Sequence, residues 1–345
     1  MSSLPGTARR YLLLVLSAFA VVAIAACGGS SSDEGSDSTQ ASATSGGSAP
    51  VTLTVGVPRN FGYLSTLWAR NVQPEGVKVE YKYFPVFTDM LTALNGGKID
   101  LTEIGSVGAI QSFANTGKVK AVAVTEPNAG NVGLIVPKDS PAKSFADLKG
   151  KKLAFLKSTN SYIFFLHQLE KAGLKESDFQ IVEISGPAAN KAFESGQIDG
   201  YYTIDPNMAD IIEQTGARLI AGGEENDVEN LYPYVATNDA IDGKREAIGK
   251  LLQAVSDNIA WIQANPDEQA KLVAPKLGFS ESAIKTSYAR GSKALQTVDE
   301  SFYTGEQAVI DELIEHDIVT KPVKATEVYL SDFNDSVTPK APARR

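Results

Sequence analysis

The chain has 345 residues, of which 43% are hydrophobic, and this length allows one large or two ordinary globular domains. The formal net charge of −9 argues against nucleic acid as a partner, because phosphate binding needs clustered lysine and arginine. A single cysteine, Cys27, excludes an internal disulfide and a cysteine metal cluster, and only two histidines are present. We therefore expect neither a metal nor another cofactor.

The amino-terminal segment has the pattern of a secretory signal peptide. Arg9 and Arg10 precede a mostly apolar run, 11–26, which is short for a membrane span of about 20 residues. The run ends in Ile-Ala-Ala-Cys-Gly at 24–28, which looks like a bacterial lipobox. This predicts cleavage before Cys27 and acylation of its thiol, and dual acylation suffices for stable anchoring. An ordinary signal peptide with an incidental cysteine is the alternative.

Strands and helices alternate in the sequence from Val51 onward. Before that point, 28–50 is dominated by Ser, Gly, Thr and Ala, which predicts a flexible tether. The alternation predicts βαβ units and a mainly parallel sheet. The expected strands of this first series are 51–57, 77–83, 99–104 and 119–125, and the expected helices are 61–70, 86–94 and 106–116.

A second series of strands and helices starts near Gly150. After it the chain is almost wholly helical from Ala240 to His316, with breaks at Pro266 and Gly278. The expected strands are 152–156, 180–184, 198–203 and 217–220, and the expected helices are 161–172, 188–195 and one opened by Asp205-Pro206.

The two series resemble copies offset by 99 residues. Residues 94–100 (LNGGKID) match 193–199 (FESGQID), and Gly97 and Gly196 fall where a helix must end, a position that favours a left-handed backbone. Chance similarity between two α/β units is the alternative. The repeat predicts two lobes, with the chain crossing between them at 133–137 and 232–237. The predicted domains are a signal peptide (1–26), a lipidated cysteine and tether (27–50), lobe 1 (51–134 and 236–335), lobe 2 (135–235) and a tail (336–345).

Ligands of open parallel α/β sheets bind beyond the carboxyl ends of the strands, where helix starts present unpaired N–H groups suited to anions. Ser106 and Asp205 stand at the offset of 99 and are also good helix N-caps, which is their structural alternative. Arg59 can offer two parallel donors to a carboxylate or sulfonate, or can be a solvent-exposed turn residue. The candidate ligand-binding residues are Arg59, Asn60, Phe61, Ser106, Val107, Thr125, Glu126, Ser158, Thr159, Asn160, Ser161, Gly186 and Asp205.

Aromatic residues also gather near these strand ends, and most of them fit a core role better than ligand contact. Their density nonetheless allows a ligand with an apolar or ring portion. They are Phe61, Tyr63, Tyr162, Tyr201, Tyr202, Tyr232 and Tyr234.

Two segments, 147–154 (DLKGKKLA) and 187–200 (PAANKAFESGQIDG), resemble the substrate-binding lipoproteins of ABC importers, in the nitrate, sulfonate, taurine and pyrimidine-precursor group. The resemblance implies a two-lobed periplasmic-binding-protein type II fold, or Venus flytrap, whose cleft captures a small molecule. It further implies an ABC permease and its ATPase as partners, and a position on the outer face of the bacterial cytoplasmic membrane. We expect a monomer.

The resemblance leaves the ligand open between two classes. A sulfonate or related small organic anion is the first choice, and a heteroaromatic, pyrimidine-type ligand is the second. An enzyme on the same fold is the less favoured alternative, because no nucleophile elbow, phosphate-binding loop or zinc-protease motif occurs. A structural or adhesive lipoprotein is the other alternative.

Overall fold

The computed structural model describes residues 49–60 and 62–337. The predicted signal peptide, Cys27, all but the last two residues of the predicted tether, Phe61 and residues 338–345 lie outside the described residues. In the part of the chain that the structure describes, no helix combines the length and the apolar character needed to cross a membrane.

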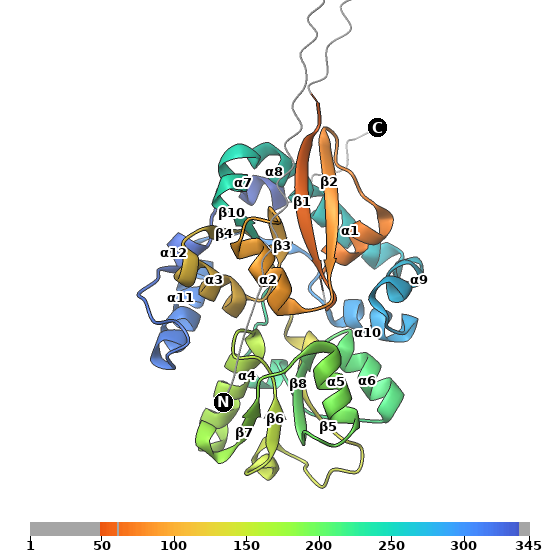
Figure 1. Cartoon of the computed structure of the whole chain (residues 1–345), viewed down its shortest axis with the longest axis vertical. Helices are drawn as coiled ribbons and strands as arrows, with labels where there is room; N and C mark the ends of the chain where they lie inside the picture. The colour runs from red at the N-terminus through yellow and green to blue at the C-terminus, as the bar shows by residue number, and fades with distance from the viewer. Residues whose placement is uncertain (1–48, 61, 338–345) are drawn as a thin grey trace, which may run out of the picture. The chain divides into compact units, whose positions relative to one another are not determined.

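The first of two sheets has six strands in the order β11-β4-β10-β3-β1-β2 (Figure 1). β1 pairs in parallel with β2 and β3, whereas β10 is antiparallel to both β3 and β4. β1 is buried because Leu53, Val55 and Val57 alternate along it and have no exposed surface. The strands are β1 (Val51–Pro58), β2 (Val77–Phe84), β3 (Leu101–Glu103), β4 (Val119–Thr125), β10 (Pro233–Thr237) and β11 (Leu295–Gln296).

The second sheet has five strands in the order β7-β6-β8-β5-β9. β6 pairs in parallel with β7 and β8, and β5 is antiparallel to both β8 and β9. The strands are β5 (Val132–Val136), β6 (Lys152–Ala154), β7 (Gln180–Val182), β8 (Gly200–Ile204) and β9 (Arg218–Gly222).

Helices flank both sheets. α1, α2 and α3 accompany the first sheet and α4, α5 and α6 the second, and α7 and α8 lie beside the first sheet (Figure 1). The α-helices are α1 (Leu64–Arg70), α2 (Phe87–Asn95), α3 (Ser106–Thr116), α4 (Asn160–Ala172), α5 (Gly186–Glu194), α6 (Asn207–Thr215), α7 (Asn238–Gly243), α8 (Arg245–Ala264), α9 (Pro266–Leu277), α10 (Glu281–Arg290), α11 (Glu300–Glu315), α12 (Ala325–Val328) and α13 (Asn334–Val337). Short 3-10 turns are η1 (Ala129–Asn131), η2 (Phe145–Leu148), η3 (Glu176–Asp178) and η4 (Glu224–Asn226).

These two helix-flanked sheets confirm the predicted α/β class, and in each sheet four strands run in one direction. We call the six-stranded sheet with α1–α3 the first lobe, and the five-stranded sheet with α4–α6 the second lobe. Gly97 and Gly196 have φ values of 65° and 71°, which confirms their predicted left-handed backbone.

The chain passes between the sheets earlier than the sequence indicates. The segments predicted as crossings, 133–137 and 232–237, lie almost entirely in β5 and β10, because their buried apolar residues pair in a sheet. The connections are instead residues 126–131, here the first crossing, and 223–232, here the second crossing.

Candidate functional site

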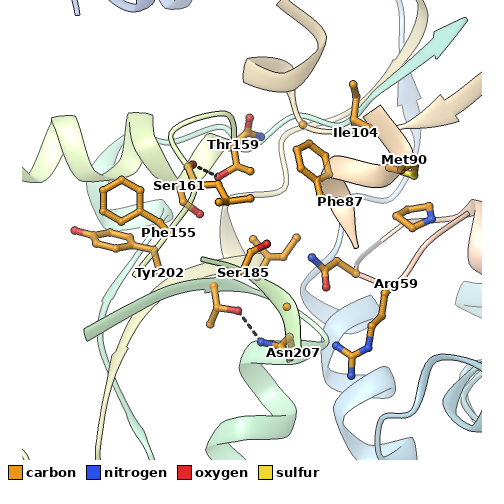
Figure 2. Close-up of a pocket in the computed structure, with 18 of the residues that line it drawn as sticks. Arg59, Phe87, Met90, Ile104, Phe155, Thr159, Ser161, Ser185, Tyr202 and Asn207 are labelled. Atoms are coloured by element: carbon orange, nitrogen blue, oxygen red, sulfur yellow. Dashed lines mark hydrogen bonds between the residues drawn. The ribbon is translucent and has the colours of Figure 1, made fainter. Parts of the chain in front are cut away.

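A pocket of about 890 Å³, partly open to solvent, lies between the two lobes. It is lined by residues at the carboxyl ends of β1, β2, β3, β6 and β8, where this architecture is expected to bind ligands. The second crossing adds Asn230 and Tyr232. Figure 2 shows side chains of both lobes facing this space.

The structure brings about half of the sequence-predicted site residues to this pocket. The pocket-lining ones are Arg59, Asn60, Thr159, Asn160, Ser161 and Gly186. Those that do not line it are Ser106, Val107, Thr125, Glu126, Ser158 and Asp205. Phe61 lies outside the described residues, and ligand contact by any of these residues stays a prediction.

Asp205 is held by the protein itself instead of facing the pocket. Its side chain has no exposed surface, accepts a hydrogen bond from the Ala209 amide at 3.0 Å and pairs with Arg290 at 3.2 Å. Burial raises the pKa of Asp205 to about 6, while Arg290 acts in the opposite direction. Asp205 therefore serves the first turn of α6, as its structural alternative implies, although it lies one residue before the N-cap, Pro206.

Thr125 is likewise buried, and its hydroxyl accepts a hydrogen bond from the Tyr232 amide at 3.1 Å. This contact fixes the end of β4 to the second crossing.

The start of α3 is also occupied by a side chain of the protein. Asn160 of the second lobe accepts a hydrogen bond from the Val107 amide through its Oδ1, at 3.1 Å. Gly105 permits this approach, because a Cβ there would lie 2.7 Å from the same oxygen. Of the two N–H groups that the sequence suggested for a ligand, that of Val107 thus donates to Asn160 and that of Ser106 donates to the Leu231 carbonyl at 3.2 Å. Both residues line a second pocket.

Glu103 is not among the sequence-predicted site residues, yet its side chain accepts hydrogen bonds at the start of α1. Its Oε2 accepts hydrogen bonds from the amides of Tyr63 at 2.8 Å and Leu64 at 3.3 Å. Burial raises the pKa of Glu103 to about 8, and the two amides oppose that rise. At pH 7 this pocket-lining carboxyl is therefore mostly protonated, and it presents little negative charge to a ligand.

Three helix starts that border the pocket remain without a side-chain cap, as far as the described residues show: those of α2, α4 and α5. Thr159, at the cap of α4, donates its hydroxyl hydrogen bond to the Leu156 carbonyl at 2.7 Å. At α5 the cap is Ser185, followed by Gly186 at a φ of 60° and by Pro187. All three helices exceed two turns, so their amino ends carry partial positive charge toward the pocket.

Arg59 is the one lysine or arginine among the described pocket-lining residues. Its guanidinium carbon lies 4.0 Å from the centre of the Phe279 ring, and its buried Nη1 has no hydrogen-bond partner among the described residues. Burial lowers the pKa of Arg59, and the charges of Tyr83 and Asp210 counteract that change. An arginine with an unused buried donor is suited to an oxyanion.

Most of the remaining pocket wall is apolar. Phe84 and Phe87 flank the turn between β2 and α2, and Leu156 and Ile204 face them from the second lobe. All four are partly exposed, so their apolar surface is available to a ligand. The sequence signal for Phe84 and Phe87 was an aromatic pair around a proline at a strand end, which equally fits a packed turn.

Of the predicted aromatic group, Tyr201, Tyr202 and Tyr232 line the pocket. They are nevertheless at most 6% exposed, in keeping with a mainly structural role. In the described part of the chain, no group of three or more His, Cys, Asp or Glu side chains could hold a metal ion.

Comparison of the sequence and the structure with known proteins identifies relatives of this chain. The chain is 29% identical over 289 residues to an Escherichia coli (strain K12) protein named as an aliphatic sulfonates-binding protein, covering 80% of this chain and 88% of that one. It matches the structure of the alkanesulfonate-binding protein SsuA from Xanthomonas axonopodis pv. citri bound to MOPS with a TM-score of 0.76 and 22% identity, covering 82% and 99% of the chains.

The fold also occurs in an enzyme. The desulfurization enzyme DSZB matches with a TM-score of 0.64 and 16% identity, covering 83% of this chain and 98% of that one. Fold alone therefore does not separate binding from catalysis. The model of the family described as NMT1/THI5 like matches residues 73–269, which is more than half of the chain, and the protein belongs to this family.

Proposed function

We propose that this protein is the extracytoplasmic solute-binding component of an ABC importer, and that it captures a small organic anion with a sulfonate-like head between its lobes. One observation carries the proposal. The starts of α1, α3 and α6 are satisfied by Glu103, Asn160 and Asp205, which leaves the starts of α2, α4 and α5, together with Arg59, open to an anion. The sulfonate names of the relatives agree with this head group.

Capture works by closure in this proposal. A ligand that touches both lobes makes contacts available only when they are together, so it shifts the population toward the closed form. The lobes that would close are the first and the second lobe defined above, joined by the two crossings, because the boundaries predicted at 134/135 and 235/236 fall inside β5 and β10. The closed form would then dock on the permease as a monomer.

Replacing Arg59 by alanine tests the head-group assignment. We expect hexane-1-sulfonate to bind the wild type in calorimetry and Arg59→Ala to weaken it about 10- to 100-fold, the loss of one charge-assisted hydrogen bond. Arg70→Ala is the matched control, because Arg70 also lies over an aromatic ring, 3.9 Å from the centre of Trp261, and does not line the pocket. Equal affinity of Arg59→Ala and wild type would contradict the assignment.

The same titrations separate the alternatives. Phe84 and Phe87 could also stack on a heteroaromatic ring, so a pyrimidine that binds where no sulfonate does would favour the second ligand class. We propose binding without turnover, and mass spectrometry should recover the sulfonate chemically unchanged. A converted product would instead place the protein with the enzymes of this fold.

Membrane attachment through Cys27 is the second part of the proposal. It rests on the sequence alone: the lipobox at 24–28 and the signal-peptide pattern before it. The expected site is the outer face of the bacterial cytoplasmic membrane. In a bacterial host, mass spectrometry of the amino-terminal peptide should show acyl chains on Cys27 of the wild type and none in Cys27→Ser, and an unacylated Cys27 in the wild type would contradict lipidation.

A further inference from the structure

A second pocket lies directly behind the first, and the two share two lining residues, Asn160 and Asn230. We call the pocket described above the front pocket and this one, of about 660 Å³, the rear pocket. The rear pocket is bounded by the start of α3, by α4, by the second crossing and by α11. The two shared asparagines therefore stand between two cavities.

The two asparagines form a hydrogen-bonded partition. Asn160 Nδ2 donates to Asn230 Oδ1 and to the Leu231 carbonyl, both at 3.1 Å. Asn230 Nδ2 donates to the Asn128 carbonyl of the first crossing at 3.0 Å. Asn160 is 7% exposed and Asn230 3% exposed. Because four segments fix these two side chains, the partition is a firm wall and cannot yield easily to a ligand.

The rear pocket has a different chemistry from the front pocket. Asp227, Glu229 and Glu306 line it together with His167, and no lysine or arginine does among the described residues. Since no described lysine or arginine lines it, the rear pocket attracts an anionic head group less than the front pocket does, where Arg59 lies. The end of the ligand that faces the partition is therefore the uncharged tail.

The placement of the front-pocket residues gives the same orientation. Ser185, Asn207 and Arg59 lie on one side of the pocket, and Phe87, Ile104 and Thr159 lie on the other (Figure 2). When the head group of the ligand binds at the start of α5 and at Arg59, its tail extends along Phe87 toward Thr159, the residue before Asn160.

We propose that the Asn160–Asn230 pair is the rear wall of the binding pocket and sets the longest apolar tail that the site accepts. This inference rests on the proposed capture of sulfonates. It assigns a specificity-determining role to Asn230, a residue that offers no group to the ligand's head.

Straight-chain alkane-1-sulfonates of increasing length provide the test. In the wild type we expect calorimetric affinity to rise about fourfold for each added methylene, the effect of burying one CH₂ group, until the tail meets the wall. Beyond that length the affinity should fall, because an overpacked site is penalised.

Asn230→Gly removes the wall while keeping the backbone. Asn230 has a φ of 52°, a left-handed conformation that glycine adopts without strain. For the first chain length that the wild type rejects, Asn230→Gly should bind about tenfold tighter or better, which reverses an overpacking penalty. Asn71→Gly is the matched control, since Asn71 has a φ of 51° at the exposed end of α1 and does not line the pocket.

Asn160→Ala removes the other half of the wall and serves if Asn230→Gly does not fold. A longer permitted tail in either variant supports the inference. Equal weakening at every chain length shows a structural role only and overturns it, as does an unchanged length limit. If no sulfonate binds even the wild type, the proposed function fails. If the wild type binds sulfonates of every chain length without a limit, the proposed function stands and only the inference about the wall fails.

Discussion

At the scale of single residues, the pocket is shaped by groups whose role depends on contacts far away in the chain. Glu103 ends a short strand, where a glutamate usually reaches solvent, and no local pattern marks it as a site residue. The Glu103 carboxyl accepts a hydrogen bond from the Tyr63 amide, 40 residues earlier in the chain, and this contact gives Glu103 its structural role. Asn160 was selected as a ligand contact, yet its amide oxygen already serves Val107, 53 residues away. A partner at such a distance is not encoded in local periodicity.

Glu103→Gln should flatten the dependence of stability on pH. The pKa of Glu103 is about 8 in the folded chain against an ordinary value of 4.5, so the folded state holds its proton more tightly. The stability from the protonated carboxyl is complete below pH 4.5 and is lost as the pH rises toward 8. Denaturant titrations between pH 5 and 8 should show a slope smaller by up to about 1.4 kcal/mol per pH unit in the variant.

The control for this prediction is Glu80→Gln. Glu80 lies on the exposed side of β2, where Lys78 lowers its pKa, so its replacement should leave the slope over pH 5–8 unchanged. Identical slopes for Glu103→Gln and wild type would show that Glu103 is ionised in the folded protein across this range.

At the scale of helices and strands, the sequence predicted the order of elements well and their partners less well. The apolar runs and the repeat at an offset of 99 placed most strands and helices of both lobes correctly, because buried strands and capped helices have local signatures. The apolar runs do not indicate which strands pair with each other in a sheet. The segments of β5 and β10 are predicted from the sequence as crossings, whereas tertiary pairing inserts each of them antiparallel between two strands of the other direction.

Whether a helix start is occupied by another side chain also depends on tertiary contacts. The sequence correctly indicated that the helix starts of both lobes gather near the strand ends, but it could not tell the occupied from the open ones. α3 and α4 come close at Gly105, the cap of α3, where a Cβ would lie 2.7 Å from the Asn160 Oδ1. The internal capping of α3 by Asn160 thus depends on the missing side chain of Gly105.

At the scale of the whole described chain, α10 joins the two lobes on the side of the first crossing. Tyr288 of α10 donates a hydrogen bond to the Gly62 carbonyl of the first lobe at 2.6 Å. In the second lobe, the side chain of Asp210 accepts from the Ser280 amide, at the cap of α10, at 2.9 Å, and Arg290 pairs with Asp205. The position of α10 was predicted only as part of a helical stretch, since its contacts unite segments 70 or more residues apart.

Arg290→Ala should destabilise the protein through the carboxylate that it leaves behind. Asp205 has no exposed surface, so without its cation the charge stays buried and its pKa rises further above 6. We expect urea titration at pH 7.5 to show a loss of about 1–3 kcal/mol, below the 3–5 kcal/mol of a fully buried pair because the Arg290 side chain is 39% exposed. Asp205→Asn in the same background removes that charge and should recover part of the loss. If the two changes are simply additive, the pair is not coupled, and α10 joins the lobes through its other contacts alone.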